Sequence, residues 1–369
     1  MKKIWMRVIG IAVSALLALT ACGCSGGTSE IAYEAEYTKD LAGTVLNVFN
    51  WGEYISDGSE GSLDVNKAFT ELTGITVNYS TYENNEAMYA KLKSGGISYD
   101  IVIPSDYMIE RMIKEDMLAK IDTASLSNYK YIDEKYRNLY FDEGNEYSVP
   151  YCVGMFGLIY NKTMVSPAPD SWSVMWDETY KNKILTFNNP RDAFAIPQLL
   201  LGQDLNTTNK ADWDQAAEKL KEQKKVLQSY VMDEVFQKME DGEAAIAPYY
   251  AGDFLLMKEN NPDLDFVYPK EGVNIFVDSI CIPKNCQNYD AAMLYLNFLL
   301  EPEIALETAE FLMYATPHTA VRSNEDYSLR DNRYLYPAEE SYPKVQYFHD
   351  IDSETRSYYE KLWEQVKLS

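Results

Sequence analysis

Aromatic and acidic side chains occur together at four places along this chain, each near the end of a predicted strand. The first place follows an apolar run that ends at Asn50, and its sequence is WGEY. The four clusters are Trp51, Glu53 and Tyr54; Ser105, Asp106 and Tyr107; Tyr249, Tyr250 and Asp253; and Phe276, Asp278 and Ser279. Aromatic faces beside a carboxylate are the surroundings that an organic cation requires. The clusters therefore predict a binding site for an amine.

An aliphatic amine matches both kinds of side chain. Each methylene group that is buried between rings gains about 0.8 kcal/mol. Each ring that faces an ammonium group adds roughly 0.5–2 kcal/mol. A carboxylate about 4 Å from the ammonium group adds on the order of 4 kcal/mol at an effective dielectric constant of about 20, before desolvation is counted. Because the desolvation of a buried ammonium group is severe, the site needs carboxylates as partners.

Several of these residues also have a purely structural interpretation. Trp51 could belong to the hydrophobic core, where most large aromatic side chains lie. Asp106 could be the N-cap of a helix that follows it. Glu53 could face solvent. Asp278 is the hardest to explain in this way, because it lies in an otherwise apolar stretch where a carboxylate without a partner is costly.

The sequence contains no motif for catalysis or for metal binding. Its two histidines, His318 and His349, belong to no partnered motif, and no nucleophile elbow, zinc-protease motif or phosphate-binding loop is found. The five cysteines include no CxxC pair and no Cys/His spacing for zinc. Cys281 lies in an apolar run and is expected to be buried, although a Cys281–Cys286 bridge stays open. We expect a binding protein without a cofactor or metal, and not an enzyme.

The overall charge narrows the class of partner. The chain has 369 residues and a net charge of −24. Nucleic-acid binding requires a basic face and is excluded on this ground. The negative charge suits a basic ligand, although solubility alone would also explain it. Apolar residues make up 46% of the chain, which supplies the cores of two domains of ordinary size.

The first 21 residues have the form of a secretory signal peptide. Three basic residues precede a short apolar stretch, and small residues lead to Cys22. The sequence LTAC resembles a bacterial lipobox, which implies cleavage before Cys22 and lipidation of this cysteine. Residues 22–43 are then expected to form a lipidated flexible tether. A diacylated cysteine holds a protein on a membrane without a further helix.

The chain behind this leader alternates strands and helices. Strands are predicted at 44–50, 75–80 and 100–105. An amphipathic helix, in which apolar residues recur at i, i+3, i+4 and i+7, begins at Val65 and stops at Gly74, and a second helix is predicted at 84–96. This order predicts a parallel sheet with helices on both faces, whose ligands bind at the carboxyl ends of the strands.

A second α/β unit begins after the stretch 147–161. A helix and a strand are predicted within 172–187, and Trp213, Ala216, Ala217 and Leu220 have the spacing of another helix. Further strands are predicted at 243–253, 264–269 and 276–283, followed by a helical stretch at 289–313. Because no linker rich in proline or glycine separates the two units, we expect two lobes that are joined by crossing strands.

Long stretches of the chain resemble the spermidine/putrescine-binding proteins of bacterial ABC polyamine transporters. The stretches are FNWGEYI, YSTYENNEAMYAKLKSGGISYDIVIPSDYMIERM, YSVPY, PKEG and FVDSICIP. The resemblance runs from about Thr44 to the C-terminus and is strongest between Val77 and Met112. It implies an α/β, type II periplasmic-binding-protein fold that closes on its ligand by a hinge motion. The expected lobes are 44–154 plus 278–322 and 155–277 plus 323–369.

The resemblance also implies which residues contact the ligand. Aromatic side chains would pack the carbon chain of a polyamine, and acids would hold its ammonium groups. The family's C-terminal glutamine contact has no clear counterpart, since Gln346 is near but Phe348 fits the register better. The predicted ligand-binding residues are Trp51, Glu53, Tyr54, Ser105, Asp106, Tyr107, Asn189, Asp192, Tyr250, Asp253, Phe276, Asp278 and Tyr314.

The sequence departs from the family pattern at several of these positions. Tyr250 and Phe276 stand where family members have tryptophan, and Gly52 replaces a residue with a hydroxyl group. Asn189 aligns with an acid of the spermidine-binding branch. Asp253 matches an acid of the putrescine-preferring branch. The resemblance thus favours putrescine, or use of both polyamines.

The predicted protein is the polyamine-binding component of an ABC importer. It is expected to be a monomer that is anchored outside the cytoplasm by its lipid, in the periplasmic space if the envelope has two membranes. Its partners would be a permease and a separate ATPase subunit. The alternatives are the same fold binding a sugar, an amino acid or a ferric ion, a surface sensor without a transport role, and an extracytoplasmic enzyme, which turnover of a bound amine would reveal.

Overall fold

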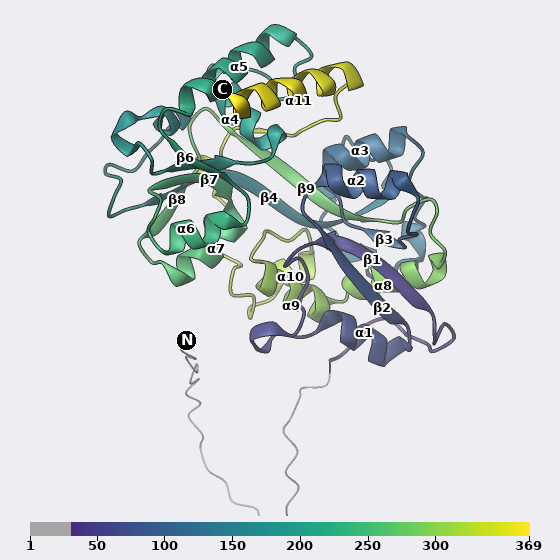
Figure 1. Cartoon of the computed structure of the whole chain (residues 1–369). Coiled ribbons are helices and arrows are strands. Elements are labelled where there is room, and N and C mark those ends of the chain that lie inside the picture. The colour runs from purple at the N-terminus through teal and green to yellow at the C-terminus, as the bar shows by residue number, and fades with distance from the viewer. Residues whose placement is uncertain (1–30) are drawn as a thin grey trace, which may run out of the picture. The chain divides into compact units, whose positions relative to one another are not determined.

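The computed structural model describes residues 31–369, which Figure 1 colours along the chain. The predicted signal peptide, residues 1–21, and the predicted lipidation site Cys22 lie outside the described residues. The described part contains the strands β1 (Val45–Trp51), β2 (Thr76–Tyr82), β3 (Ile101–Val102), β4 (Ser148–Asn161), β5 (Ile184–Phe187), β6 (Leu227–Val231), β7 (Ile246–Tyr250), β8 (Leu264–Val267), β9 (Val273–Cys281) and β10 (Val345–Gln346).

The same part contains α-helices and short 3₁₀ helices. The α-helices are α1 (Val65–Thr73), α2 (Asn85–Ser94), α3 (Asp106–Lys114), α4 (Pro190–Leu201), α5 (Lys210–Gln223), α6 (Glu234–Glu240), α7 (Ala251–Asn260), α8 (Tyr289–Leu299), α9 (Pro302–Leu312), α10 (Thr319–Ser323) and α11 (Ser353–Leu368). The 3₁₀ helices are η1 (Ser59–Gly61), η2 (Thr123–Ser125), η3 (Ser127–Tyr131), η4 (Glu134–Tyr136), η5 (Trp172–Trp176), η6 (Glu178–Tyr180) and η7 (Glu339–Ser341).

Helix α1 shows how local sequence sets the ends of an element. Asp64 caps its N-terminus by accepting a hydrogen bond from the backbone N–H of Lys67 at 2.9 Å. Gly74 ends the helix in the left-handed conformation, with φ of +75°, which a residue with a side chain adopts only with strain. Val65 and Phe69 are fully buried on its inner face. The predicted helix and its predicted stop are confirmed.

Two long strands connect the two halves of the sheet. The strand order is β2-β1-β3-β9-β4-β7-β5-β6, with β10 paired to β9 and β8 paired to β4. β1 is parallel to both β2 and β3, as predicted. β4 and β9 are antiparallel, from Ser148 opposite Cys281 to Met155 opposite Ile275. Figure 1 shows them running from the group β1–β3 to the group β5–β8. They are crossing strands, so the predicted architecture of two α/β lobes is confirmed.

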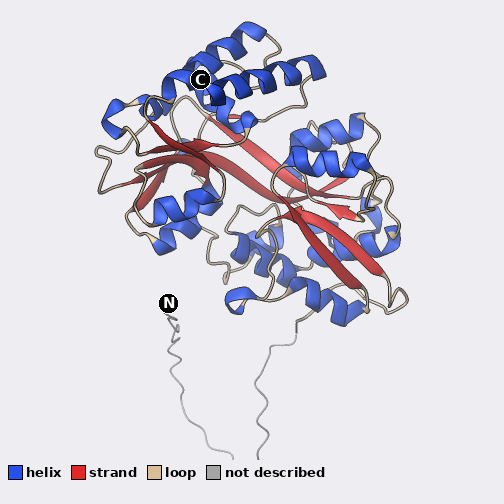
Figure 2. Ribbon diagram, in the orientation of Figure 1, coloured by secondary structure: helices blue, strands red, loops and turns tan. Residues whose placement is uncertain are grey.

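Helices cover both faces of the sheet, as Figure 2 shows. Around β1–β3, the first lobe, Phe69 of α1 packs against Tyr295 and Phe298 of α8 with ring centroids 5.0 and 5.1 Å apart. Around β5–β8, the second lobe, Trp213 of α5 stacks on Tyr359 of α11 at 4.8 Å. Such aromatic pairs contribute beyond their buried area. Each lobe therefore has a packed aromatic cluster of its own.

Three predicted elements differ from those in the structure. The first helix predicted within 172–187 is reduced to the 3₁₀ helix η5. The helix predicted over 289–313 is divided into α8 and α9, because Pro302 lacks an N–H group and begins the second helix. The strand predicted over 243–253 stops at Tyr250, where α7 begins. Asp253 thus lies in the first turn of a helix and not in a loop.

The segment that precedes β1 is packed against the first lobe. The rings of Tyr33 and Tyr37 each lie 5.8 Å from the ring of Phe298 of α8, measured between centroids. The compact part of the chain accordingly begins at Tyr33. The prediction of a flexible tether over 22–43 is therefore wrong from Tyr33 onward, because aromatic contacts and hydrogen bonds hold this segment on α8 and α9.

A buried carboxylate at the start of α9 depends on this segment. Glu301 is fully buried and accepts hydrogen bonds from the backbone N–H groups of Glu34 and Ala35, at 2.7 and 2.9 Å, and from the Tyr37 hydroxyl at 2.8 Å. We expect Glu301→Gln to lower the free energy of unfolding in urea by roughly 2–3 kcal/mol. The amide NH₂ group of glutamine would replace one carboxylate oxygen and face backbone N–H or hydroxyl donors that it cannot accept. Glu307→Gln, on the exposed face of α9, is the control. Equal stability of the two variants would contradict the expectation.

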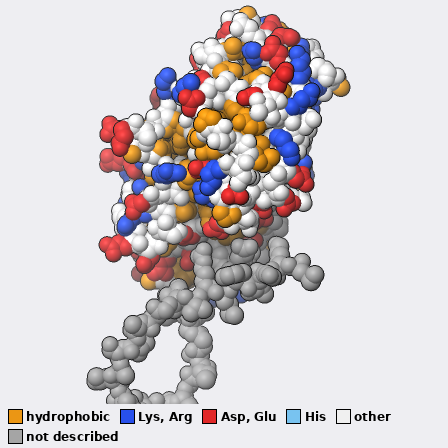
Figure 3. All heavy atoms as spheres, turned by 90° about the vertical axis from the view of Figure 1, so that its left-hand side faces the viewer, with side chains coloured by type: hydrophobic (Ala, Val, Ile, Leu, Met, Phe, Trp, Pro, Cys, Tyr) orange, Lys and Arg blue, Asp and Glu red, His pale blue; other side chains and the backbone are white. Residues whose placement is uncertain are grey.

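None of the helices within residues 31–369 has the length and apolar character that crossing a membrane requires. Cys152, Cys281 and Cys286 are free thiols in the structure, so the open question of a Cys281–Cys286 bridge is answered by two unpaired cysteines. Figure 3 shows the left-hand side of Figure 1, where acidic and basic side chains are interspersed around hydrophobic ones. This face has no continuous basic surface of the kind that binds nucleic acid.

Candidate functional site

Aromatic rings from both lobes form a continuous run of contacts, which we call the aromatic box. It begins at the end of β1, passes the loop after α9 and the middle of β9, and ends at β7. The centroid separations are 6.3 Å for Trp51 and Tyr54, 5.9 Å for Tyr54 and Tyr314, 6.3 Å for Tyr314 and Phe276, and 5.6 Å for Phe276 and Tyr250. The structure thus brings together aromatic residues that the sequence predicted for one site.

Two glycines allow the backbone to lie against these rings. A Cβ atom on Gly154 of β4 would lie 2.2 Å from Cζ of Phe276, and a Cβ atom on Gly252 of α7 would lie 2.5 Å from Cδ2 of Tyr314. Both distances are far shorter than van der Waals contact. The positions of the two rings therefore require glycine at both places.

Asp278 lies beside Tyr54 and is only 3% exposed. Its Oδ2 accepts a hydrogen bond from the Tyr54 hydroxyl at 2.7 Å, and Sγ of Cys152 lies 2.7 Å from the same hydroxyl. Its Oδ1 has no hydrogen-bond partner among the described residues. Burial raises the pKa of Asp278 to about 6, while hydrogen bonds from Tyr54 and Ser105 oppose this rise. Oδ1 of Asp278 is free to accept a hydrogen bond from a ligand, and a buried oxygen that stays unpaired is costly.

The position of Asp278 in the fold differs from the predicted one. Phe276 and Asp278 were expected at a strand end, but both lie inside β9, which is buried along its whole length. Residues i and i+2 of a strand share one face of the sheet. Phe276 and Asp278 can therefore face the same site from the middle of a crossing strand.

Asp192 lies at the other end of the aromatic box, in the first turn of α4. Its Oδ2 accepts hydrogen bonds from the Tyr250 hydroxyl and from Nδ2 of Asn189, both at 2.6 Å. Asn189 is also the N-cap of α4, and its Oδ1 accepts the backbone N–H of Asp192 at 2.9 Å. Burial raises the pKa of Asp192, against these hydrogen bonds and the nearby Arg191. The structure brings Asn189, Asp192 and Tyr250 into one group.

Asp253 belongs to the same region of the site. It lies in the first turn of α7, the helix that begins directly after Tyr250. Burial raises the pKa of Asp253 to about 7, a hydrogen bond from Tyr314 opposes this rise, and the charge of Asp233 adds to it. Perturbed carboxylates beside aromatic rings are typical of binding sites.

Ser105 and Tyr107 are held by one buried asparagine of α2. Nδ2 of Asn85 donates hydrogen bonds to the Ser105 hydroxyl at 3.0 Å and to the Tyr107 hydroxyl at 3.2 Å, and Oδ1 of Asn85 accepts the backbone N–H of Ser105 at 3.2 Å. Asn85 is 4% exposed. It therefore fixes the residues at the end of β3 in place.

Asp106 is not the N-cap of the helix that follows it. Ser105 occupies the N-cap position of α3, and Asp106 is the first residue of the helix. The carboxylate of Asp106 is fully buried, and it accepts the backbone N–H groups of Tyr107 at 2.7 Å and of Val277 at 3.2 Å. Asp106 thus joins α3 to β9 behind the site. The N-cap prediction is wrong because the helix begins at Asp106 itself, one residue earlier than that prediction required.

Glu53 is separated from the other predicted acids. It lies in the turn after β1 with φ of +52°, and its side chain is exposed. The structure does not bring it to the described aromatic box. Solvent exposure, one of the two interpretations of Glu53, is the one that the structure supports.

The site belongs to a chain with recognisable relatives. Residues 65–332 match the family described as bacterial extracellular solute-binding protein. The chain belongs to this family.

Curated and solved proteins agree with this assignment. The solute-binding protein is 34% identical over 324 residues to the spermidine/putrescine-binding periplasmic protein of Salmonella typhimurium. The alignment covers 87% of this chain and 91% of the relative. A solved structure from Listeria monocytogenes, titled a putative spermidine/putrescine ABC transporter, has 35% sequence identity and a TM-score of 0.83. The match covers 88% of this chain and 99% of the Listeria chain. A lipoprotein of Treponema pallidum has 27% identity and a TM-score of 0.78, with coverages of 88% and 100%.

These matches confirm the predicted resemblance and the predicted fold. Proteins of this family bind solutes and do not transform them, so the chain is a binding protein and not an enzyme. Within residues 31–369, no three His, Cys, Asp or Glu side chains come together in a way that could hold a metal ion.

Two residues of the solute-binding protein's site were not predicted from the sequence. Cys152 of β4 contacts the hydroxyl of Tyr54 beside Asp278, but it reads in the sequence as one buried cysteine in a strand. Glu86 of α2 accepts a hydrogen bond from the Tyr107 hydroxyl at 3.0 Å, but it reads as an ordinary acid in the first turn of a helix. Glu86 precedes AMYAKLK in the longest stretch of resemblance, and this position was the signal in the sequence that could have drawn attention to it.

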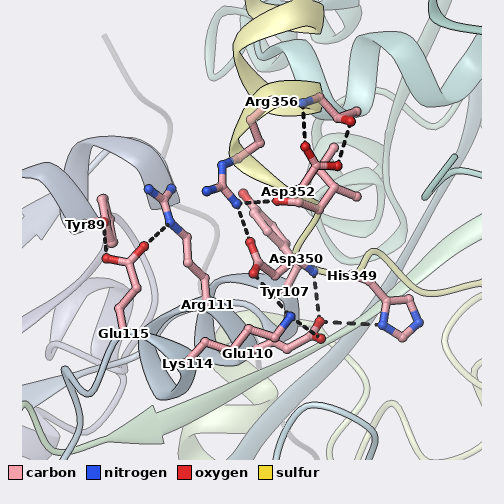
Figure 4. Close-up of polar contacts among 12 residues, drawn as sticks. Tyr89, Tyr107, Glu110, Arg111, Lys114, Glu115, His349, Asp350, Asp352 and Arg356 are labelled. Carbon is pink, nitrogen blue, oxygen red and sulfur yellow. Dashed lines mark hydrogen bonds and ion pairs between the residues drawn. The ribbon is translucent and has the colours of Figure 1, made fainter. Parts of the chain in front are cut away.

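An ion-pair network connects α3 to the segment before α11, as Figure 4 shows. Nζ of Lys114 lies 2.8 Å from Oε1 of Glu110 and 3.2 Å from Oδ2 of Asp350, and the backbone N–H of Asp350 donates to Oε2 of Glu110 at 2.8 Å. Arg356 completes the network through its own bond to Asp350. The network holds the segment that carries Phe348 against α3.

Phe348 is the residue of this segment that reaches the site. Its ring meets that of Tyr107 edge-on at 6.1 Å. Gln346 points elsewhere, since its Oε1 accepts the backbone N–H of Leu205 at 3.0 Å. Of the two candidates for the C-terminal ligand contact, Phe348 lies beside the predicted site residues.

Proposed function

We propose that this solute-binding protein captures a polyamine, putrescine or spermidine, outside the cytoplasm and delivers it to an ABC permease that a separate ATPase drives. The observation that carries the proposal is the buried Asp278, whose Oδ1 lacks a donor among the described residues although it lies beside the aromatic box. The names of the relatives from Salmonella typhimurium and Listeria monocytogenes support the same class of solute.

The chemistry of the site favours an amine over a neutral solute. A sugar could stack on the aromatic rings, but its hydroxyl groups would leave Asp278, Asp253 and Asp192 without a counter-charge. An ammonium group supplies donors and a positive charge together. The methylene groups between two ammonium groups would then lie against the rings of the aromatic box.

The residues present favour putrescine, or use of both polyamines. Asp253 supplies an acid beside Tyr314. Asn189 supplies an amide where the spermidine-binding branch has an acid, and it is already committed to hydrogen bonds with Asp192. The site thus has fewer acids near α4 than a triamine would favour.

Other parts of the proposal concern location and assembly. Cys22 would carry the lipid anchor, and one of the structural neighbours is itself a lipoprotein. The lobes would be 44–154 plus 278–322 and 155–277 plus 323–369, with the segment from Tyr33 packed on the first lobe. The protein would act as a monomer, since each solute is held between its own two lobes.

Calorimetric titration of the purified protein tests the function. We expect putrescine and spermidine to bind with Kd values of about 1 μM or lower, equivalent to about −8 kcal/mol or more favourable. Butane-1,4-diol, which keeps the carbon chain but lacks the charges, and neutral sugars should give no heat of binding. Binding of a sugar or an amino acid in place of the amines would show that the fold serves another solute. No binding of any solute would favour a sensor without a transport role.

A further inference from the structure

A β-bulge in the crossing strand β4 brings Cys152 opposite Asp278. Pro150 pairs with Ser279 of β9, and the next pair is Cys152 with Asp278, so Tyr151 is an extra residue on β4. In a regular ladder, Tyr151 would pair with Asp278, and Cys152 would point to the other face of the sheet. Residues directly opposite on antiparallel strands share one face, with Cβ atoms about 4.5–5.5 Å apart. The bulge therefore turns the thiol of Cys152 toward the face that carries the Asp278 carboxylate.

The hydroxyl of Tyr54 connects this thiol to the carboxylate. It lies 2.7 Å from Sγ of Cys152, and it donates a hydrogen bond to Oδ2 of Asp278 at 2.7 Å. A tyrosine hydroxyl has one proton, and a charged carboxylate can only accept. The Tyr54 proton is therefore used on Asp278, and the thiol proton is the one that the Tyr54 oxygen accepts. The three groups form a directed chain of hydrogen bonds that ends on the carboxylate.

Strand β4 holds Tyr54 by two consecutive residues. The Tyr151 hydroxyl donates to the backbone carbonyl of Tyr54 at 2.8 Å, while Cys152 contacts the hydroxyl at the far end of the Tyr54 side chain. Cys152 and Tyr54 are both buried, so water does not compete for their bond. Burial and the charge of Asp278 raise the pKa of the thiol and of the hydroxyl, so both keep their protons at neutral pH.

The chain of hydrogen bonds uses one oxygen of Asp278 and leaves the other for the ligand. Oδ1 has no hydrogen-bond partner among the described residues, although the side chain is buried. A buried carboxylate oxygen without a donor points to a partner that comes with the ligand. Hydrogen bonds in a chain polarise one another, so a thiol that donates to Tyr54 makes the Tyr54 hydroxyl a stronger donor to Oδ2.

We propose that Cys152 is a positioning residue of the amine site, whose thiol directs the Tyr54 proton onto Asp278 and so favours the charged carboxylate that an ammonium group needs. The inference rests on the proposed function. Cys152 acts through Tyr54 and needs no contact with the ligand. When Asp278 is protonated, the chain can reverse, with Asp278 donating to Tyr54 and Tyr54 to the sulfur. The thiol is a weak partner in both directions, but only the first direction ends on a charge, where polarisation is largest.

Other titratable groups face this part of the site from neighbouring elements. Burial raises the pKa of Asp106 of α3 and of Tyr82 of β2, and the charge of Asp278 raises both further. Asp253 of α7 adds to the rise in the pKa of the Cys152 thiol after burial and Asp278. Because these groups are unchanged in the variants of Cys152, their effects cancel when such a variant is compared with the wild type.

The test measures putrescine affinity by calorimetry at pH 8 and at pH 5.5. Cys152→Ala should leave Kd within about twofold of the wild type at pH 8, where Asp278 is charged in both proteins. At pH 5.5, Kd should be roughly 2- to 10-fold weaker than that of the wild type, because losing the thiol raises the pKa of Asp278 above its value of about 6. Cys152→Ser keeps a donor at this place and should stay within about twofold of the wild type at both pH values.

Two controls separate this role from a general effect of losing a buried thiol. Cys281→Ala removes a fully buried cysteine of β9, three residues from Asp278 and therefore on the opposite face of the strand, and should leave Kd within about twofold at both pH values. In a Tyr54→Phe background, Cys152→Ala should change Kd by less than about twofold at pH 5.5, because the thiol acts through the hydroxyl. Thermal unfolding shows whether each variant is folded.

The outcomes distinguish the inference from the proposed function. A Cys152→Ala variant that binds putrescine like the wild type at both pH values would refute the inference. So would an equal loss at both pH values, or a loss at pH 5.5 that Cys152→Ser shares, because either would mark a role in packing and not in donation. Wild-type protein that binds no amine would instead refute the proposed function.

Discussion

Asp278→Asn should remove most of the affinity for putrescine and spermidine and leave the protein folded. The aspartate is 3% exposed, and its Oδ1 has no donor among the described residues. An ammonium group that enters this place loses its water and gains the carboxylate. With asparagine, the same group would be desolvated against an amide, which leaves a buried charge unpaired at a cost of about 3–5 kcal/mol. We therefore expect Kd to rise by roughly 10²- to 10³-fold.

Folding of this variant should not be impaired at pH 8. Burial raises the pKa of Asp278 to about 6 in the folded protein, from an ordinary value of 3.8. Between these two values the folded state binds more protons than the unfolded state, so this residue's contribution to stability falls as pH rises. Asparagine carries no charge and avoids the penalty. The midpoint of thermal unfolding at pH 8 should be equal to or higher than that of the wild type.

Calorimetry and thermal unfolding on the same samples check both parts of this expectation. Asp263→Asn, an identical change on the exposed loop before β8, is the matched control and should bind like the wild type. A variant at Asp278 that still binds putrescine within about threefold of the wild type would contradict the role of this carboxylate.

The arrangement of the fold could be predicted from local patterns in the sequence. The spacing of Val65, Phe69 and their neighbours predicts α1, and the order of strands and helices predicts the parallel pairing of β1, β2 and β3. The lack of a flexible linker predicts crossing strands, which are β4 and β9. These features depend on residues close together in the chain, where periodicity and turn residues act directly.

The features that were missed depend on contacts between distant residues. Asp278 was placed at a strand end because its apolar neighbours do not show where β9 stops, and β9 extends as far as its partners β3 and β4 allow. The hydrogen bond between Glu86 and the Tyr107 hydroxyl depends on how α2 and α3 meet, which the local sequence does not show. Tyr33 and Tyr37 were predicted to be part of a flexible tether. Their ring contacts with Phe298 and the hydrogen bond from Tyr37 to Glu301 join segments that are far apart in the chain, so the local sequence does not show them.

Affinity for putrescine should rise with pH between 5.5 and 8 and then stay level. Burial raises the pKa of Asp278 to about 6 and that of Asp253 to about 7 in the free protein, so both are largely protonated at pH 5.5. An ammonium group binds their charged forms and must displace these protons. Full deprotonation of both acids on binding would make Kd about 100-fold weaker at pH 5.5 than at pH 8. Alkyl amines resemble lysine, with a pKa of about 10.4, and stay charged over this range.

The protons themselves provide an independent measurement of this linkage. At pH 6.5, the two pKa values imply a release of roughly one proton for each putrescine bound. Titrations in two buffers with different heats of ionisation measure this number directly.

Asp253→Asn should remove the part of the pH dependence that is centred near pH 7 and leave the part near pH 6, because Asp278 remains. An affinity that does not change between pH 5.5 and 8, with no proton release, would mean that neither carboxylate meets the amine. A pH dependence that is the same in the Asp253 variant as in the wild type would instead assign the ammonium contact to Asp278 alone, and Asp253 would then act on the aromatic box through its hydrogen bond with Tyr314.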